Sequence, residues 1–212
     1  MLTRTCALID LAEGIRRNRG PLSERWQLVH EEFLRWAARP QLREHLRDHL
    51  RLLSPLQAAV VASRSRETTT HFAWCLLDEP ADSFSFWLHE YKPQRDWRQG
   101  YADSVHNHRY HFCTTILRGG YVHERYDAEL DQQAEMINSA VLNRRQICET
   151  GQSGMLLASE FHRIPTAADS TMTFLVKSRP VNGWSLSYDP TTRMSHRHVP
   201  VETRLGELTE KI

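Results

Sequence analysis

Two histidines separated by one residue are the side chains most able to do chemistry in this sequence. In the segment GYADSVHNHRYHFC, Gly100 is followed after five residues by His106 and then by His108. In an extended strand residues two apart point to the same face, so both imidazoles can reach one ion while Asn107 points away. Imidazole suits first-row transition metals, and another strand can supply a third ligand. The spacing therefore predicts a metal site.

Short segments rich in aromatic and β-branched residues surround this pair and are typical of strands. They begin after Ser63 and are separated by turn residues such as Pro80, Gly119 and Gly183. These segments are HFAWCLL, FSFWLHEY, HFCTTILRG, YVHERY, GMLLAS, TMTFLVKS and WSLSY. Regular short strands without long helices between them predict a mainly β barrel or sandwich over residues 63–212.

The first part of the chain, residues 1–62, has a different pattern. Its apolar residues recur at helical spacing, and in the run REHLRDHLRLL leucines fall on one stripe between charged neighbours. Proline is tolerated in a first helical turn, so we expect Pro21 to open a second helix and Pro40 to separate it from a third. Three helices are thus predicted to pack on the barrel. The polar segment 127–145 is interpreted as a loop or an inserted helix.

The histidine segment resembles the first cupin motif. That motif has a glycine, an H-x-H pair, a further ligand position and a second glycine, here Gly100, His106 with His108, Cys113 and Gly120. Most cupins carry glutamate at the further position. Cysteine at this place is similar to the cysteine dioxygenase branch, in which three histidines alone bind the iron.

The resemblance continues through the later strands, from Phe84 to Pro190. GGYVHERY has the shape of that family's glycine and E-x-x-aromatic segment, and in SEFHRI the histidine His162 matches the third ligand. The resemblance implies a cupin double-stranded β-helix, or jelly-roll barrel, preceded by α-helices. It also implies that His106, His108 and His162 hold iron(II), with O2 as co-substrate.

Four residues near these ligands are the candidate catalytic residues. Cys113 is one of them, because the resemblance places it at the glutamate position of the motif. Glu160 and Arg163 lie beside His162 and could orient it, since metal-bound imidazoles need hydrogen-bond partners. His111, on the face opposite His108 if the strand stays regular, is expected to support or pack beside the site.

Several other polar side chains are expected in supporting places. Asp103 and Glu124 are further candidates for orienting the ligands. His123 is expected to pack or to support a ligand. The second H-x-H pair, His196 and His198, lies near a charged tail without framing glycines, so we expect it on a solvated face.

Two positions depart from the cysteine dioxygenase pattern. Lys177 stands where that family has the tyrosine that bonds covalently to the cysteine, so no such crosslink to Cys113 is expected. Trp74 stands near the place of the arginine that holds the amino acid carboxylate, a task suited to a planar guanidinium. Free cysteine is therefore not the expected substrate. The aromatic residues that could line a larger and more apolar pocket are Trp74, Phe86, Trp87, Tyr101, Phe112 and Trp184.

The predicted function is that of a non-haem iron(II)-dependent oxygenase acting with O2 on a small molecule. Three neutral imidazoles leave about three positions open on an octahedral ion, which suits a substrate beside O2. Two alternatives stay open. Cupins also include isomerases and lyases that use a metal as a Lewis acid, and the same barrel can bind a small molecule without catalysis.

Composition argues against several other classes. The chain has 27 basic and 26 acidic residues among 212, a net charge of +1 that favours neither nucleic acid nor an anionic membrane as partner. Four scattered cysteines without a C-x-x-C pair are expected to be reduced thiols. Neither a hydrophobic leader nor a membrane-spanning stretch is recognised, so we expect a cytoplasmic monomer or homodimer.

Overall fold

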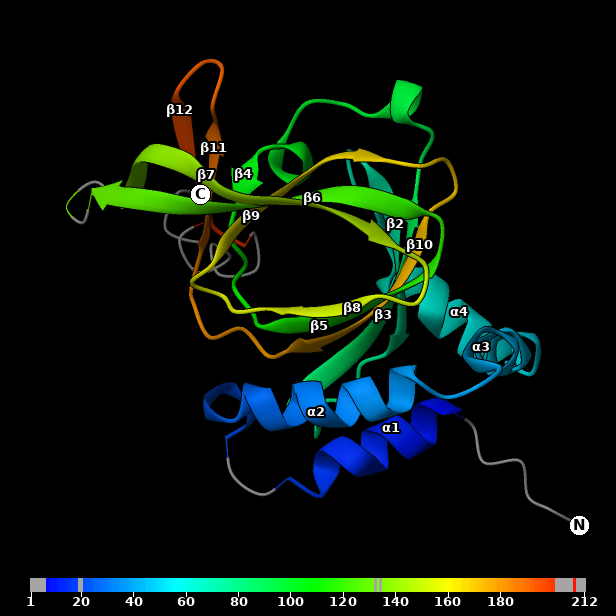
Figure 1. Ribbon diagram of the computed structural model, residues 1–212. Coiled ribbons are helices and arrows are strands. Elements are labelled where there is room, and N and C mark those ends of the chain that lie inside the picture. Colours follow the sequence, from blue (N-terminus) through cyan, green and yellow to red (C-terminus); the bar gives the residue numbers. More distant parts are fainter. Residues whose placement is uncertain (1–6, 19–20, 132, 134, 201–207, 209–212) are drawn as a thin grey trace, which may run out of the picture.

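An N-terminal group of helices covers one side of two facing β-sheets (Figure 1). The computed structural model describes residues 7–18, 21–131, 133, 135–200 and 208. The α-helices are α1 (Ala7–Arg16), α2 (Trp26–Ala37), α3 (Leu42–Arg51) and α4 (Pro55–Arg64). Short 3₁₀ turns are η1 (Leu22–Glu24), η2 (Gln94–Asp96) and η3 (Tyr101–Asp103).

The described part of the chain has four α-helices before the first strand, where three were predicted. Pro21 opens only the 3₁₀ turn η1, and α2 begins after that turn. The additional helix α4 begins at Pro55, where the Ser54 hydroxyl accepts a hydrogen bond from the Gln57 N–H and completes a capping box. This Ser-Pro-x-Gln sequence is a helix-start signal that the periodic leucines of α3 hide.

The strands form two antiparallel sheets. They are β1 (Arg66–Glu67), β2 (His71–Leu77), β3 (Phe84–Tyr91), β4 (Val105–His106), β5 (Phe112–Arg118), β6 (Gly120–Asp131), β7 (Met136–Glu149), β8 (Ser153–Leu156), β9 (Phe161–Ala167), β10 (Met172–Ser178), β11 (Ser185–Asp189) and β12 (Met194–His198). The helix-side sheet has the order β1-β2-β3-β10-β5-β8, and the far sheet has the order β12-β11-β4-β9-β6-β7.

The strands from β3 to β10 are connected as a jelly roll. In the helix-side sheet the first of them, β3, pairs with the last, β10, and β5 and β8 follow. In the far sheet β4 pairs with β9, and β6 and β7 follow. This is the arrangement of two Greek keys in two packed sheets. The prediction of a mainly β, cupin-type jelly-roll barrel preceded by helices is confirmed.

The interpretation of residues 127–145 as a loop or a helix was wrong. Its described residues lie in the long hairpin of β6 and β7, where Asp127 pairs with Val141 and Ala128 pairs with Ala140. Pairing with a neighbouring strand overrides the helix-compatible composition, because strand formation depends strongly on cross-strand context. Much of β7 is exposed, so its residues keep the polar character that resembles a loop.

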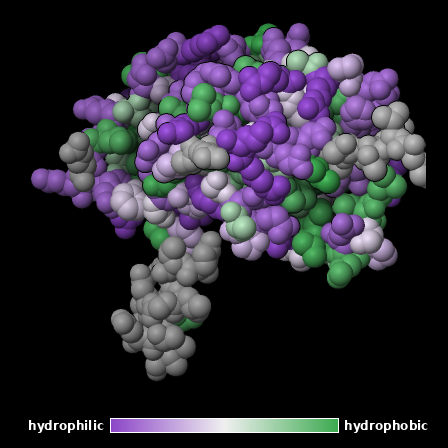
Figure 2. Space-filling model, turned by 90° about the horizontal axis from the view of Figure 1, so that it is seen from below, coloured by the Kyte–Doolittle hydropathy of each residue, from purple (hydrophilic) through white to green (hydrophobic). Residues whose placement is uncertain are grey.

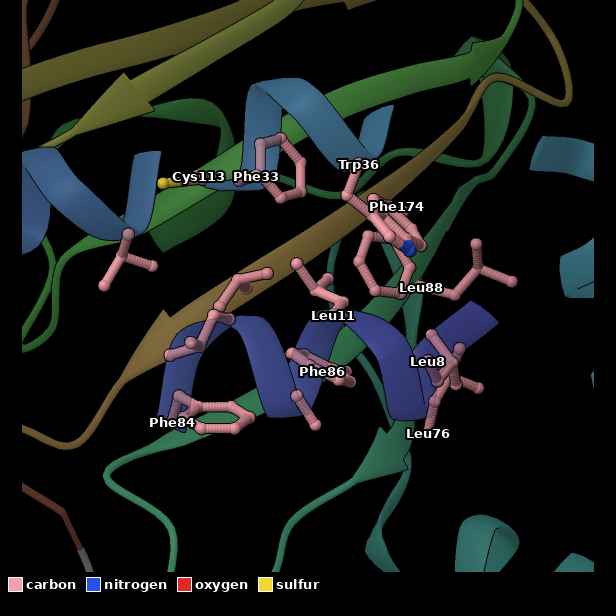
Figure 3. Packing of buried hydrophobic residues seen from close by; sticks show 14 of the residues in the cluster. Leu8, Leu11, Phe33, Trp36, Leu76, Phe84, Phe86, Leu88, Cys113 and Phe174 are labelled. Atoms are coloured by element: carbon pink, nitrogen blue, oxygen red, sulfur yellow. The ribbon is translucent and has the colours of Figure 1, made fainter. Parts of the chain in front are cut away.

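The largest hydrophobic cluster lies between the helices and the helix-side sheet (Figure 3). The ring centroid of Phe174 in β10 lies 6.4 Å from that of Phe33 and 4.7 Å from that of Trp36, both in α2. The Trp36 indole Nε1 donates to the Ala7 carbonyl at 2.8 Å and ties α2 to α1. The opposite side of the helices, seen from below in Figure 2, is mostly hydrophilic. The helices therefore attach to the barrel through one apolar face.

None of the described helices is both long and apolar enough to span a bilayer. Cys75, Cys113 and Cys148 are free cysteines and are buried, whereas Cys6 lies outside the described residues.

Candidate metal centre

Strand β4, which ends at His106, and the two residues after it place the histidine pair as the spacing predicts. His106 pairs directly with His162 of β9. The Asn107 side chain points away from them: its Nδ2 donates to the Ala158 carbonyl at 3.2 Å, and its Oδ1 accepts from the Leu186 N–H at 2.7 Å. Because a buried amide must keep its polar atoms paired, these two bonds fix the strand on both sides and hold the imidazoles on one face.

The imidazoles of His106, His108 and His162 converge on one point. The Nε2 atoms of His108 and His162 are 2.9 Å apart, and the ligand nitrogens of all three residues lie within 4.8 Å of one another. Two nitrogens that each lie about 2.1 Å from one ion, at a right angle, are about 3.0 Å apart. The three residues therefore fit a transition-metal ion bound by nitrogen alone.

Hydrogen bonds orient two of the three imidazoles. The His106 Nδ1 donates to the Ser104 carbonyl at 2.8 Å, which leaves its Nε2 lone pair for an ion. The His162 Nδ1 shares a hydrogen bond with the His123 Nε2 at 3.0 Å, so His123 has the supporting role that was one of its two expected roles. Burial lowers the pKa of His106 to about 4 and the pKa values of His108 and His162 well below their usual range. The imidazoles are thus held in the neutral form that binds metal.

Cys113 does not face these histidines, which corrects its expected place in the site. Successive residues of β5 point to opposite faces. Phe112 takes the inner face, with its ring centroid 5.1 Å from that of His108 and 5.9 Å from that of His162. Cys113 is buried in the cluster under the helices (Figure 3), and burial raises the pKa of its thiol. An apolar ring, and neither a thiol nor a carboxylate, therefore stands beside the ligands at this point of the motif.

His111 also lies on the helix side of the barrel. Its Nδ1 accepts a hydrogen bond from the Ala158 N–H at 2.9 Å, and its ring centroid is 6.0 Å from that of Trp26 in α2. His111 is not among the residues that line the cavity described below. Its contacts therefore join α2 to the segment before β9, which is the packing role expected for it. The prediction of His111 as a catalytic residue is corrected, because its side chain does not reach the ligands.

Glu160 and Arg163 hold the backbone around the site. Glu160 accepts from the Arg125 guanidinium at 2.5 Å, and the Arg163 Nε donates to the Asp103 carbonyl at 2.7 Å. Neither residue lines the cavity. The expectation that they orient His162 directly is corrected, because the partner of that imidazole is a histidine from the neighbouring strand β6.

Asp103 and Glu124, the other candidates for orienting the ligands, also bond elsewhere. The Asp103 carboxylate accepts from the Gly100 N–H at 2.7 Å and closes the turn before β4. The Glu124 carboxylate accepts from the Tyr126 hydroxyl at 2.7 Å and lies 3.3 Å from the Arg145 guanidinium. Asp103 therefore shapes the turn before the ligands, and Glu124 is bound by side chains of β6 and β7.

The three ligand histidines line a cavity of about 1050 Å³ between the sheets. Of the aromatic residues expected there, Tyr101 and Phe112 line it. Phe86 instead belongs to the hydrophobic cluster under the helices, and Trp74 packs against that cluster. Trp87 belongs to a second buried cluster with Phe112, and Trp184 is 38% exposed. Strand alternation decides whether a strand residue faces the cavity or the helices, because neighbouring residues of one strand face opposite sides of the sheet.

A polar group on the inner face of the helix-side sheet was not predicted from the sequence. His71 of β2 and His89 of β3 stack with ring centroids 4.2 Å apart, and both line the cavity. Burial lowers the pKa of His71 to about 3 and the pKa of His89 well below its usual range. Lys177 of β10 lines the same wall. The signal in the sequence is a titratable residue within an otherwise apolar strand, as in TFLVK.

The second H-x-H pair is divided between two environments. His196 is exposed, as predicted, but His198 lines the cavity and shares a hydrogen bond between its Nε2 and the Ser187 hydroxyl at 2.7 Å. The Tyr101 ring centroid lies 4.8 Å from that of His198 and 4.4 Å from that of His106. Strand β12 therefore closes the cavity next to the metal centre.

No protein-family model and no curated protein matches the sequence. Solved structures with a similar fold include the DMSP lyase DddQ from Ruegeria pomeroyi DSS-3, with a TM-score of 0.40, 14% identity, and coverage of 70% of this chain and 67% of that chain. The hydroxypropylphosphonic acid epoxidase from S. wedmorenis has a TM-score of 0.35, 13% identity, and coverage of 55% and 56%. An oxalate decarboxylase from Lactobacillus farciminis has a TM-score of 0.37, 17% identity, and coverage of 56% and 31%. The chain thus spans about half of the epoxidase and a third of the decarboxylase, and these similarities are too low to transfer an activity.

Proposed function

We propose that this protein is a metal-dependent enzyme that acts on a small molecule in the barrel cavity, with His106, His108 and His162 holding iron(II) and O2 as co-substrate. The observation that carries the proposal is a group of three converging imidazoles that contains no carboxylate. Among the described residues, no aspartate or glutamate lines the cavity. A site of this composition resembles the three-histidine branch of the cupins more than it resembles a site with two histidines and one carboxylate.

Bound iron(II) would supply open coordination positions for substrate and O2 and the redox chemistry that joins them. The protein side chains prepare the place. Ser104 and His123 fix two ligand imidazoles through their Nδ1 atoms. Phe112 presents an apolar ring to the same point, so it excludes water from that side.

Tyr101 is positioned to contact a substrate beside the ligands. Its ring lies against His106, and its hydroxyl donates to the Asn107 carbonyl. Burial raises the pKa of Tyr101, so its hydroxyl stays protonated over the physiological range. The residue therefore offers a fixed ring beside the ligands, and the Asn107 carbonyl holds its hydroxyl proton.

The metal assignment is tested by loading the metal-free protein with iron(II) under anaerobic conditions. We expect the wild type to bind about one equivalent, measured by metal analysis after desalting, and His106→Ala to lose nearly all of it while staying folded. His45→Ala is the matched control, because His45 is an exposed histidine of α3. Full iron content in the His106→Ala protein would overturn the site.

The oxygenase assignment needs a separate measurement. We expect the iron(II)-loaded protein to give the EPR signal of a high-spin iron nitrosyl with nitric oxide, a stand-in for O2, and the His106→Ala protein to lack it. We also expect O2 uptake, followed with an electrode, when small thiols and carboxylic acids are screened as substrates. A loaded protein that binds iron but gives no nitrosyl signal would contradict the assignment.

A metal-dependent lyase or isomerase is the second candidate. Tyr101, Tyr110 and Tyr121 line the cavity, and tyrosine hydroxyls can donate protons in such reactions. Product formation without O2 uptake, supported equally by zinc or manganese, would select this candidate over the oxygenase. A folded, metal-loaded protein that binds the screened compounds but turns none over would instead indicate a binding protein.

A further inference from the structure

The cavity has a one-sided charge. Among the described residues its lining holds four arginines and one lysine, but no aspartate or glutamate. These cationic residues are Arg66, Arg109, Arg125, Arg144 and Lys177, of which Arg125 is paired with the Glu160 carboxylate. A cavity whose charged groups all have one sign favours a ligand of the opposite sign.

The two buried lysines of the described chain show that Lys177 is unusual. The Lys92 Nζ donates to the Glu67 carboxylate at 2.5 Å and to the Thr68 carbonyl at 2.6 Å. Lys177, which is only 4% exposed, has instead two aromatic contacts: its Nζ lies 4.3 Å from the Trp87 ring centroid and 5.1 Å from that of Tyr110. No carboxylate of the described residues pairs with it. A buried ammonium needs a partner, and here an anion from outside the chain can supply it.

Arg66 brings a second cation to the same place. Its guanidinium carbon lies 5.1 Å from the Trp87 ring centroid, so two cations contact one indole. Burial and, after it, the charge of Arg66 hold the pKa of Lys177 well below its usual range. An anion that contacts both cations would relieve their repulsion and restore the charge of the lysine.

Lys177 lies close to the candidate metal centre. Tyr110 contacts both Lys177 and His108: its ring centroid is 5.1 Å from the Lys177 Nζ and 5.1 Å from the His108 ring centroid, on which it stacks. The distance from the Lys177 Nζ to the His108 ring therefore cannot exceed the sum of these two values. A small molecule can reach the lysine with one end and the ligand histidines with the other.

We propose that Lys177 and Arg66 form an anion subsite that binds the carboxylate of the substrate, beside Trp87 and Tyr110. The identification of this anion as the substrate rests on the function proposed above, but the subsite itself does not require a metal. The substrate class is a small carboxylic acid with a second group that reaches the three histidines. The arginine that an amino acid dioxygenase would use at the position of Trp74 is thereby replaced by two cations from other strands.

The subsite is tested by calorimetric titration of the metal-free protein with benzoate and with benzamide, which have the same shape but differ in charge. We expect benzoate to bind at least tenfold more tightly than benzamide. Lys177→Met and Arg66→Gln should each weaken benzoate binding by tenfold or more and leave benzamide binding unchanged. Arg118→Gln is the control, because Arg118 is exposed at the end of β5 and does not line the cavity.

Thermal unfolding checks that each variant is folded. Because Arg66 is exposed, Arg66→Gln still tests the subsite if Lys177→Met does not fold. Equal binding of benzoate and benzamide by the wild type, or unchanged benzoate binding in both variants, would overturn the subsite. The His106→Ala protein separates the two proposals. Benzoate binding that persists in it supports the subsite even if the iron assignment fails, whereas benzoate binding that depends on His106 and not on Lys177 refutes the subsite.

Discussion

The two faces of the helix-side sheet are built from the same strands but have opposite chemistry. Along β10, Phe174 and Val176 point to the helices and are fully buried in an apolar cluster. Thr173, Leu175 and Lys177 alternate with them and line the cavity. One face therefore attaches the helices, and the other face holds titratable groups opposite the metal ligands.

This difference shows that residues of one strand can be buried for two different physical reasons. β10 is buried almost throughout, so its residues look like a uniform core strand. On the helix side, burial comes from close packing of side chains, and the free energy of folding depends on it. On the cavity side, Leu175 packs in a second, smaller cluster, whereas the Lys177 side chain lines the cavity, so we expect its replacement to affect binding more than folding.

The largest expected effect lies on the helix side. Phe174→Ala removes a ring packed on Phe33, Trp36 and Phe86, so we expect a loss of about 3–5 kcal/mol in the free energy of unfolding, measured by urea denaturation. The iron affinity of the remaining folded protein should not change. Cys113→Ala, on the same face, should also leave iron binding intact at a smaller cost in stability. A loss of iron binding in either variant would show that the two faces are not independent.

A smaller effect is expected at the support of a ligand. His123→Ala removes the hydrogen bond to the His162 Nδ1, and we expect the iron affinity to fall by about 10–100-fold, because such partners fix the ring and tautomer of a ligand. Anaerobic titration with iron(II) measures this change, and His196→Ala is the control with an exposed histidine. Equal iron affinities in the two variants would show that His123 does not support the His162 ligand.

The smallest expected effect is a dependence of stability on pH that belongs to the cavity face. In the folded chain the pKa of His71 is lowered to about 3, from a usual value of 6.5. As the pH falls below about 6.5, His71 binds a proton in the unfolded chain but stays neutral in the folded chain. This residue therefore lowers the free energy of unfolding by up to about 1.4 kcal/mol per pH unit.

Urea denaturation of the metal-free protein at neutral and mildly acidic pH measures this slope. We expect His71→Asn to be less sensitive to acid than the wild type, while His45→Asn, at an exposed position, keeps the wild-type slope. Phe174→Ala should be less stable by the same amount at both pH values. An unchanged slope in His71→Asn would mean that acid acts elsewhere in the molecule.

The sequence alone predicted the three histidines of the candidate metal centre and the fold class. The two-residue period of a strand places His106 and His108 on one face and Asn107 on the other, and this holds whatever surrounds the strand. Short strands after helical spacing indicated the mainly β barrel with helices in front. The helix count and residues 127–145 were misjudged, because composition is a weaker guide than capping signals and strand pairing.

Only the tertiary structure decided which neighbours meet at the centre. The irregular residues between His108 and β5 set the phase of that strand, so Phe112 and not Cys113 faces the ligands, and spacing cannot reveal this. Lys177 and Arg66 come from strands far apart in the chain, and only the sheet order brings them around one indole. Local periodicity fixes the face of a residue, but the contacts across a cavity depend on how distant strands pair.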